Sequence, residues 1–124
     1  MTRRLVEIMP DMTKPDVEEG NRFIDRIIKT NREIFILSSL LDKQMCGYEI
    51  IKEIFLRCNV FLSQGSVYPI LYSLEEEGLL HVEYTRGDMR SKMYSLTPKG
   101  RESVQRDIEN FIEAIDHISA LIRG

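Results

Sequence analysis

The sequence predicts a mainly α-helical protein with one small β hairpin. Apolar residues recur every three or four positions in four segments, which is the spacing of helices with one buried face. Between residues 80 and 96, apolar and polar residues instead alternate in two short runs around a glycine-containing turn, as in paired strands. With 43% hydrophobic residues among 124, the chain can bury one core, so we expect one domain.

The N-terminal half of the chain begins with residues that do not resemble a core element. Residues 1–20 carry two prolines and a glycine among scattered charges, which predicts an N-terminal tail or arm. Residues 21–41 then show a helical apolar period. Thr30 and Glu33 have the spacing of a capping box, so this segment is either one long helix or two helices.

A second helix is predicted after a turn over residues 42–46. It spans residues 47–57, and its expected packing positions are Tyr48, Ile51, Ile54 and Phe55. Tyr48 has an alternative role as a polar contact through its hydroxyl. Cys46 and Cys58 lie at opposite ends of this helix, too far apart to form a disulfide within the chain, and we expect both to be reduced.

Residues 63–80, with the sequence SQGSVYPILYSLEEEGLL, predict a helix that buries one face and leaves its start free. Ser63 suits the N-cap, and Gly65 lets another backbone come close. Ser66 and Tyr68 add hydroxyl groups near the positive end of the helix dipole, which attracts anions. The start of this helix therefore predicts contact with phosphate, and the glycine after the acidic run predicts the end of the helix.

The hairpin that follows is locally basic although the whole chain has a net charge of -3. From residue 81 to residue 101 there are five basic and two acidic residues, a balance of +3, which leaves -6 for the remainder. Arg86 and Arg90 lie in the turn, and Lys92 enters the return strand. This pattern predicts a basic wing beside a helix-turn-helix. The acidic remainder either keeps DNA from other faces or serves only solubility.

A last helix is predicted over residues 98–124, with an apolar seam of heptad spacing. Its positions, 4, 3, 4, 3 and 4 residues apart, are Val104, Ile108, Phe111, Ile115, Ile118 and Ile122. Such a long ridge favours pairing with a second copy of the chain. The alternative is that the ridge folds back on the helix of residues 21–41.

Three blocks in this order resemble PadR-like transcriptional regulators. They are GYEI at residues 47–50, the 63–80 segment and YSLTPKGR at residues 94–101. The resemblance covers the chain from about residue 31 onward. It implies a winged-helix homodimer that binds a palindromic operator in double-stranded DNA and usually represses transcription until an effector is sensed. The implied organisation is a tail (1–20), a winged helix-turn-helix domain (21–97) and a C-terminal dimerisation helix (98–124).

The DNA contacts are expected at the start of the third predicted helix and in the wing. Gln64 is the candidate base reader, because its amide can pair with adenine, although such a glutamine commonly faces solvent. Tyr68 and Tyr72 can exchange the roles of packing and contact. The full set of expected DNA-binding residues is Ser63, Gln64, Gly65, Ser66, Tyr68, Arg86, Arg90 and Lys92.

Other classes of function find little support in the sequence. His81 and His117 have no nucleophile or carboxylate at catalytic spacing, and the cysteines and histidines lack metal-ligand spacing, so no catalytic residue, metal or cofactor is predicted. No segment predicts a signal peptide or a membrane span, and we expect a cytoplasmic protein. The alternative function is a protein interaction module that uses the winged helix and the C-terminal helix without binding DNA.

Overall fold

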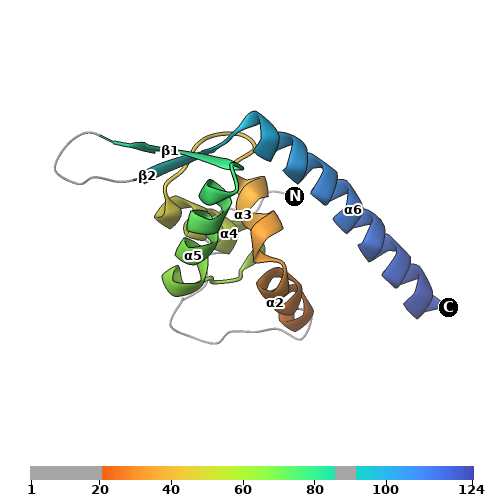
Figure 1. Cartoon of the computed structure of the whole chain (residues 1–124). Helices are drawn as coiled ribbons and strands as arrows, with labels where there is room; N and C mark the ends of the chain where they lie inside the picture. The colour runs from red at the N-terminus through yellow and green to blue at the C-terminus, as the bar shows by residue number, and fades with distance from the viewer. Residues whose placement is uncertain (1–20, 86–91) are drawn as a thin grey trace.

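A computed structural model describes residues 21–85 and 92–124. Its elements, in chain order, are α2 (Asn21–Thr30), α3 (Arg32–Ser39), α4 (Gly47–Cys58), α5 (Gln64–Glu76), β1 (Leu80–Tyr84), β2 (Lys92–Leu96) and α6 (Pro98–Arg123). Figure 1 shows α3, α4 and α5 gathered together, with the hairpin extending to one side and α6 running away on the other. The predicted mainly helical fold with one hairpin is confirmed. The predicted tail (1–20) and the wing residues Arg86 and Arg90 lie outside the described residues.

The segment of residues 21–41 forms two helices, which is one of the two alternatives that the sequence allows. The helices meet at Asn31, whose backbone leaves the helical region with φ -124° and ψ 43°. Its side-chain amide donates to the Ile27 carbonyl at 2.8 Å and so caps the end of α2. Thr30 and Glu33 do not form the capping box that their spacing allows, because Thr30 is the last residue of α2 and Asn31 is the N-cap of α3.

The core lies between α3, α4, α5 and the near end of α6. Its completely enclosed side chains come from every one of these helices and are Ile36, Ile50, Val67, Leu71, Leu74 and Val104. On α5 they recur at intervals of four and three residues, so one stripe of the helix faces the core. This stripe fixes which face of α5 remains outside.

Tyr48 is a correction to the predicted packing of α4. Its side chain is 60% exposed, whereas Ile50, which the prediction left out, is fully buried. The buried stripe of α4 is centred on Gly47, Ile50 and Ile54. Tyr48 lies about a quarter turn from that stripe at 100° per residue, so its ring projects from the surface.

The hairpin is an antiparallel pair whose register places Val82 opposite Tyr94 and Tyr84 opposite Lys92. It is attached to the helices through a bridge between Tyr94 and Met45, the residue two before α4. The Met45 N–H donates to the Tyr94 carbonyl at 3.0 Å, and the Tyr94 N–H donates to the Met45 carbonyl at 2.8 Å. The base of the wing is therefore hydrogen-bonded to the loop that leads into α4.

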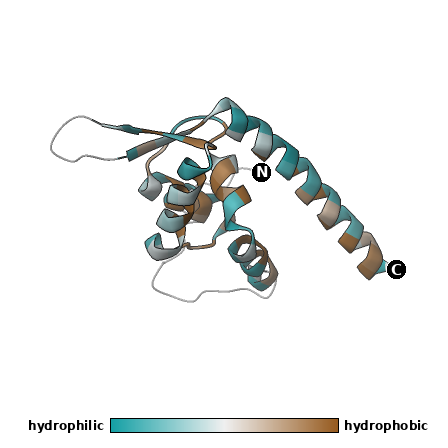
Figure 2. Cartoon of the chain, viewed as in Figure 1, coloured by the Kyte–Doolittle hydropathy of each residue, from teal (hydrophilic) through white to brown (hydrophobic). Residues whose placement is uncertain are grey.

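The apolar seam of α6 divides into two halves. In the first half, Val104 is enclosed in the core, Ile108 packs against it, and the Phe111 ring meets Phe35 of α3 edge to face at 5.7 Å. In the second half, Ile115, Ile118 and Ile122 are 38%, 51% and 80% exposed. Figure 2 shows the apolar colouring of these last turns, which extend beyond the rest of the molecule. Within residues 21–85 and 92–124, the chain covers its own seam as far as Phe111.

Candidate nucleic-acid interface

The start of α5 is an exposed and well-capped helix end. The Ser63 hydroxyl accepts from the Ser66 N–H at 3.2 Å, and the Ser66 hydroxyl donates to the Ser63 carbonyl at 2.9 Å. Ser66 therefore uses its hydroxyl proton inside the cap, whereas the exposed Ser63 keeps a donor. The first N–H groups of a helix have no partner within it, so Gln64 and Gly65 add backbone donors at the positive end of the dipole. This end suits a phosphate group.

Gly65 leaves open space in front of the helix. A Cβ built on this glycine meets nothing nearer than the Ser63 hydroxyl, at 4.0 Å. The protein itself therefore has room for a side chain at this position. Beside it, Gln64 is exposed as the first residue of α5, so its amide is available to a ligand.

Tyr68 joins the start of α5 to the start of α4. A Cβ on Gly47 would lie 2.5 Å from the Tyr68 Cζ and hydroxyl oxygen, so the ring rests against the bare backbone of Gly47. The Tyr68 side chain is nevertheless 39% exposed. Of the two roles that the sequence left open, the structure shows packing for Tyr68, and part of its side chain also lies at the surface.

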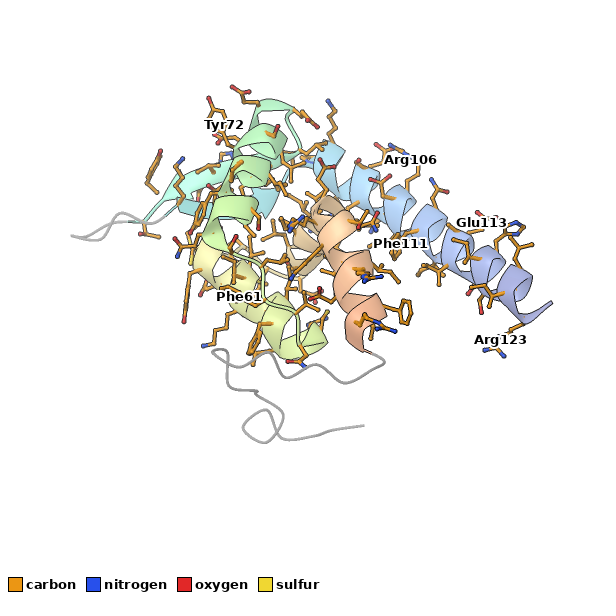
Figure 3. The ribbon with its side chains drawn as sticks, turned by 90° about the horizontal axis from the view of Figure 1, so that it is seen from below. Phe61, Tyr72, Arg106, Phe111, Glu113 and Arg123 are labelled. Carbon is orange, nitrogen blue, oxygen red and sulfur yellow. The ribbon has the colours of Figure 1, made fainter. Side chains whose placement is uncertain are left out.

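Three further tyrosines are exposed, of which the sequence left Tyr48 and Tyr72 open as contacts and did not single out Tyr84. Tyr48, Tyr72 and Tyr84 are 60%, 58% and 61% exposed, and Figure 3 shows Tyr72 projecting outward from α5. A hydrogen bond to the Glu76 carboxylate, with the charge of that group, raises the pKa of the Tyr72 hydroxyl. The Tyr72 hydroxyl thus stays protonated and donates its one proton to Glu76, so it is not free to donate to a DNA phosphate.

Tyr94 has a different place, in the wing base. It is buried, and burial, followed by the charge of Glu75 and the nearby Tyr68 and Tyr84 hydroxyls, raises its pKa. In the structure, Tyr94 lies opposite Val82 of β1 and bridges to Met45 before α4. Tyr94 therefore marks where the wing meets the loop that leads into α4.

The basic charge of residues 81–101 is less concentrated at the wing than the count predicts. Lys92 lies at the wing, with its ammonium group 6.0 Å from the centre of the Tyr84 ring. Lys99 and Arg101 instead donate to backbone carbonyls, those of Glu77 at 3.1 Å and Leu41 at 3.2 Å. Of the expected wing cations, Lys92 is the one within the described residues.

The described residues contain no group of three or more His, Cys, Asp or Glu side chains placed to hold a metal ion. None of the helices within them has both the length and the apolar character needed to span a bilayer. Cys46 and Cys58 are free thiols. Burial raises the pKa of Cys58, which lowers its thiolate fraction and its reactivity toward oxidants.

An exposed helix start, a supporting helix beneath it and a hairpin attached beside it define a winged helix-turn-helix protein. Residues 36–106 match the model of the transcriptional regulator PadR-like family, and the chain belongs to this family. Its members are DNA-binding regulators of transcription and not enzymes.

Solved structures of the same family share the fold over most of their length. A PadR family transcription regulator from hypervirulent Clostridium difficile R20291 is 28% identical, with 74% of this chain and 97% of that chain covered and a TM-score of 0.65. A PadR family regulator from Eggerthella lenta is 20% identical, with 83% and 91% covered and a TM-score of 0.73. A PadR-like regulator from Bacillus cereus is 24% identical, with 80% and 98% covered and a TM-score of 0.70. Among proteins with curated descriptions, none matches the sequence significantly.

The Gly65→Ala variant tests whether the start of α5 contacts DNA, because the substitution should leave the fold intact. The space at Gly65 predicts an unchanged or slightly raised free energy of unfolding, by up to about 1 kcal/mol, because alanine favours the helix over glycine. If backbone approach to DNA requires glycine, affinity for DNA falls at least ten-fold, measured by fluorescence anisotropy. Ser73→Ala, an exposed change on the same helix, is the control. If Gly65→Ala bound DNA with the affinity of the wild type, the start of α5 would not be part of the DNA interface.

Proposed function

We propose that the protein is a homodimeric repressor of the PadR type that acts in the cytoplasm on a palindromic operator and responds to a small-molecule effector. The observation that supports it most is the exposed, capped start of α5 beside the wing. This arrangement occurs in a chain whose terminal helix leaves an apolar surface uncovered. Such a surface suits a second copy, and a two-fold dimer reads a site of two-fold symmetry.

In the proposed complex, the start of α5 enters the major groove. Ser63 and Tyr68 donate to phosphates, while Gly65 lets the backbone come close. Gln64 reads a base through its amide. Ser66 acts through the cap that orders this turn, since its hydroxyl is bonded to the Ser63 carbonyl.

The wing and the exposed tyrosines extend this contact. Lys92, together with Arg86 and Arg90 of the turn, supplies charge to the DNA backbone. Tyr48 and Tyr84 are exposed on α4 and β1, next to the residues already named. We assign them to phosphate contact, which orients the protein without reading sequence.

The proposed dimer interface uses the second half of α6. Ile115, Ile118 and Ile122 are exposed there, and Ile112 and Leu121 widen the surface. On α2, Phe23, Ile24 and Ile27 are also exposed and offer a second apolar surface to the partner. Val104, Ile108 and Phe111 support this interface from within, because they hold the first half of α6 on α3.

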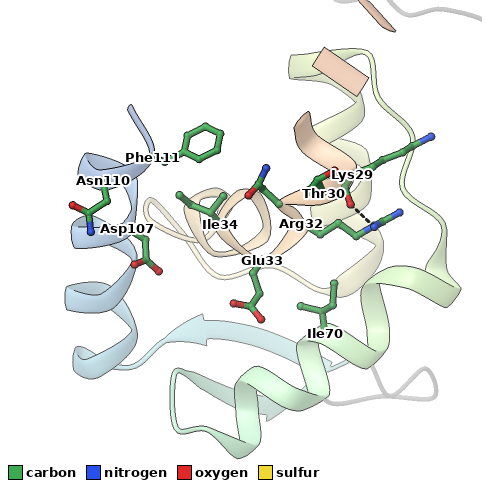
Figure 4. Close-up of a pocket in the computed structure, with 10 residues that line it drawn as sticks. Lys29, Thr30, Arg32, Glu33, Ile34, Ile70, Asp107, Asn110 and Phe111 are labelled. Carbon is green, nitrogen blue, oxygen red and sulfur yellow. Dashed lines mark hydrogen bonds between the residues drawn. The ribbon is translucent and has the colours of Figure 1, made fainter. Parts of the chain in front are cut away.

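The proposed effector site is a pocket of about 620 Å³ that is lined in part by α5, the helix proposed to read DNA, and by α6, the helix proposed to form the dimer. Figure 4 shows its lining: the α2–α3 junction around Arg32, Ile70 of α5, and Phe111 of α6. The Arg32 Nε is buried and, among the described residues, has no hydrogen-bond acceptor. A ligand with an acceptor group for Arg32 and an apolar part against Ile70 and Phe111 would lie in a lining that also carries the carboxyl groups of Glu33 and Asp107. It would touch the helices proposed for DNA reading and for dimerisation together.

A titration of DNA from upstream of the gene tests DNA recognition, with a scrambled duplex as control and salt varied. We expect tight, sequence-selective and salt-dependent binding by two chains per site. Lys92→Ala should weaken binding and lower the salt slope by about one. Arg106→Ala, which removes an exposed charge on α6, should change neither. Equal, weak binding to both duplexes would favour the interaction module instead.

The dimer is tested by placing a charge in the uncovered half of the α6 seam. Ile118→Asp should give a folded monomer with the 14.5 kDa mass of one chain, where the wild type has twice that mass. The carboxylate would have to be buried without a partner in the interface. Ala120→Asp adds the same charge about half a helical turn away and should remain dimeric. If sedimentation showed that the Ile118→Asp and Ala120→Asp variants dimerise equally strongly, the dimer interface would lie elsewhere.

The effector site is tested with compounds chosen from a library because they release DNA from the wild type. We expect Arg32→Gln to raise the concentration needed for release at least ten-fold, because the buried Nε donor is lost. Ser39→Ala, in a separate pocket of about 420 Å³, is the control. Equal potency on Arg32→Gln and wild type would exclude this pocket, and a library without any releasing compound would count against effector control.

A further inference from the structure

The first turn of α6 is hydrogen-bonded to the backbone that leaves α5. Three successive carbonyls after α5, those of Glu77, Gly78 and Leu79, each accept a hydrogen bond from this turn. The donors are the Lys99 ammonium group at 3.1 Å, the Thr97 hydroxyl at 2.7 Å and the Thr97 N–H at 3.1 Å, in that order. The end of α5 and the start of α6 are therefore held directly together.

Gly100 brings the two backbones into contact at this point. A Cβ on Gly100 would lie 2.0 Å from the Leu79 carbonyl oxygen and 2.9 Å from its carbon. Since backbone atoms cannot rotate away as a flexible side chain can, any side chain here would displace α6. The absence of a side chain at Gly100 thus allows α6 to lie this close to Leu79, the residue that ends the turn after α5.

Arg101 provides an anchor on a different element. Its guanidinium group donates to the Leu41 carbonyl at 3.2 Å, and Leu41 follows the end of α3. The attachments after α5 and after α3 add to the packing of Val104, Ile108 and Phe111, which also restricts the direction of α6. We call Thr97, Lys99, Gly100 and Arg101 the clamp.

A small change at the clamp would become a large displacement at the far end of α6. The helix runs without interruption for 26 residues, which is about 39 Å at 1.5 Å per residue. A rotation of the whole helix by about 10°, which would also shift the contact between Phe111 and Phe35, would move its end by roughly 7 Å over that length. This equals about two base-pair steps of 3.4 Å along DNA.

We propose that the clamp sets the spacing between the two DNA half-sites that the dimer accepts. By fixing the angle between α5 and α6, it fixes the distance between the α5 helices of two chains joined through α6. Lys99 and Arg101 are then positioning residues, and their charges do not contact DNA. The inference rests on the proposed homodimer and its palindromic operator.

The probe is the palindromic duplex that the wild-type protein selects from random-sequence DNA, with one or two base pairs added or removed between its half-sites. A change of one base pair rotates one half-site by about 35° relative to the other. We expect the wild type to lose affinity at least ten-fold for each such change.

The test variant is Lys99→Met with Arg101→Met, which keeps the aliphatic stems and removes the donors. We expect this variant to bind an isolated half-site with an affinity within two-fold of wild type. Its loss of affinity when the half-site spacing is changed should fall to about three-fold or less. Gly100→Ala, which displaces α6 outright, should move the preferred spacing by at least one base pair. Lys92→Ala is the control, because loss of a contact to the DNA backbone should lower affinity by the same factor at every half-site spacing.

Two results would overturn the inference. An unchanged spacing profile in both variants would show that the clamp does not set it. A uniform loss of affinity in the Lys99 and Arg101 variant, with a salt slope lower by about two, would make these residues phosphate contacts. Failure of the proposed function is distinct, because it appears in the wild type itself as a monomer or as a protein without preference for a palindrome.

Discussion

The contact between Gly100 and the Leu79 carbonyl is the constraint on which the rest of the structure depends. Leu79 ends the turn after α5, and the next residue begins the wing strand β1, so this point joins three elements. Gly78, at φ 79°, makes the preceding turn possible, because the left-handed region favours glycine. With Thr97 bonded to the same turn, the position of α6 follows from where α5 ends.

The arrangement separates the proposed surfaces for DNA and for a partner while connecting them through the core. The buried stripe of α5 leaves the helix start exposed, and the bridge from Tyr94 to Met45 places the wing beside it. At the other side, the contact between Phe35 and Phe111 holds α6 on α3 before the helix extends beyond the core. A ligand between α3, α5 and α6 would therefore act on packed elements that both surfaces share.

Local patterns predicted the elements well, because helical period, caps and strand alternation depend on neighbours in sequence. Patterns that depend on distant partners were less informative. The α6 seam has the same period throughout, and only the tertiary fold shows that the chain covers it as far as Phe111. The charges of Lys99 and Arg101 suggested the wing, but their acceptors lie 22 and 60 residues away in sequence. Tyr48 has helical spacing with buried residues, yet lies beside their stripe.

We infer that α5 and α6 form one rigid unit and that two such units pair through α6. Electron spin resonance between labels at Ser73→Cys on α5, in a Cys46→Ser and Cys58→Ser background, measures the distance between the α5 helices of a pair. A rigid pair should give one narrow distance distribution that DNA leaves unchanged. A broad distribution that narrows only on DNA would contradict the rigid unit, and the absence of dipolar coupling would contradict the pair.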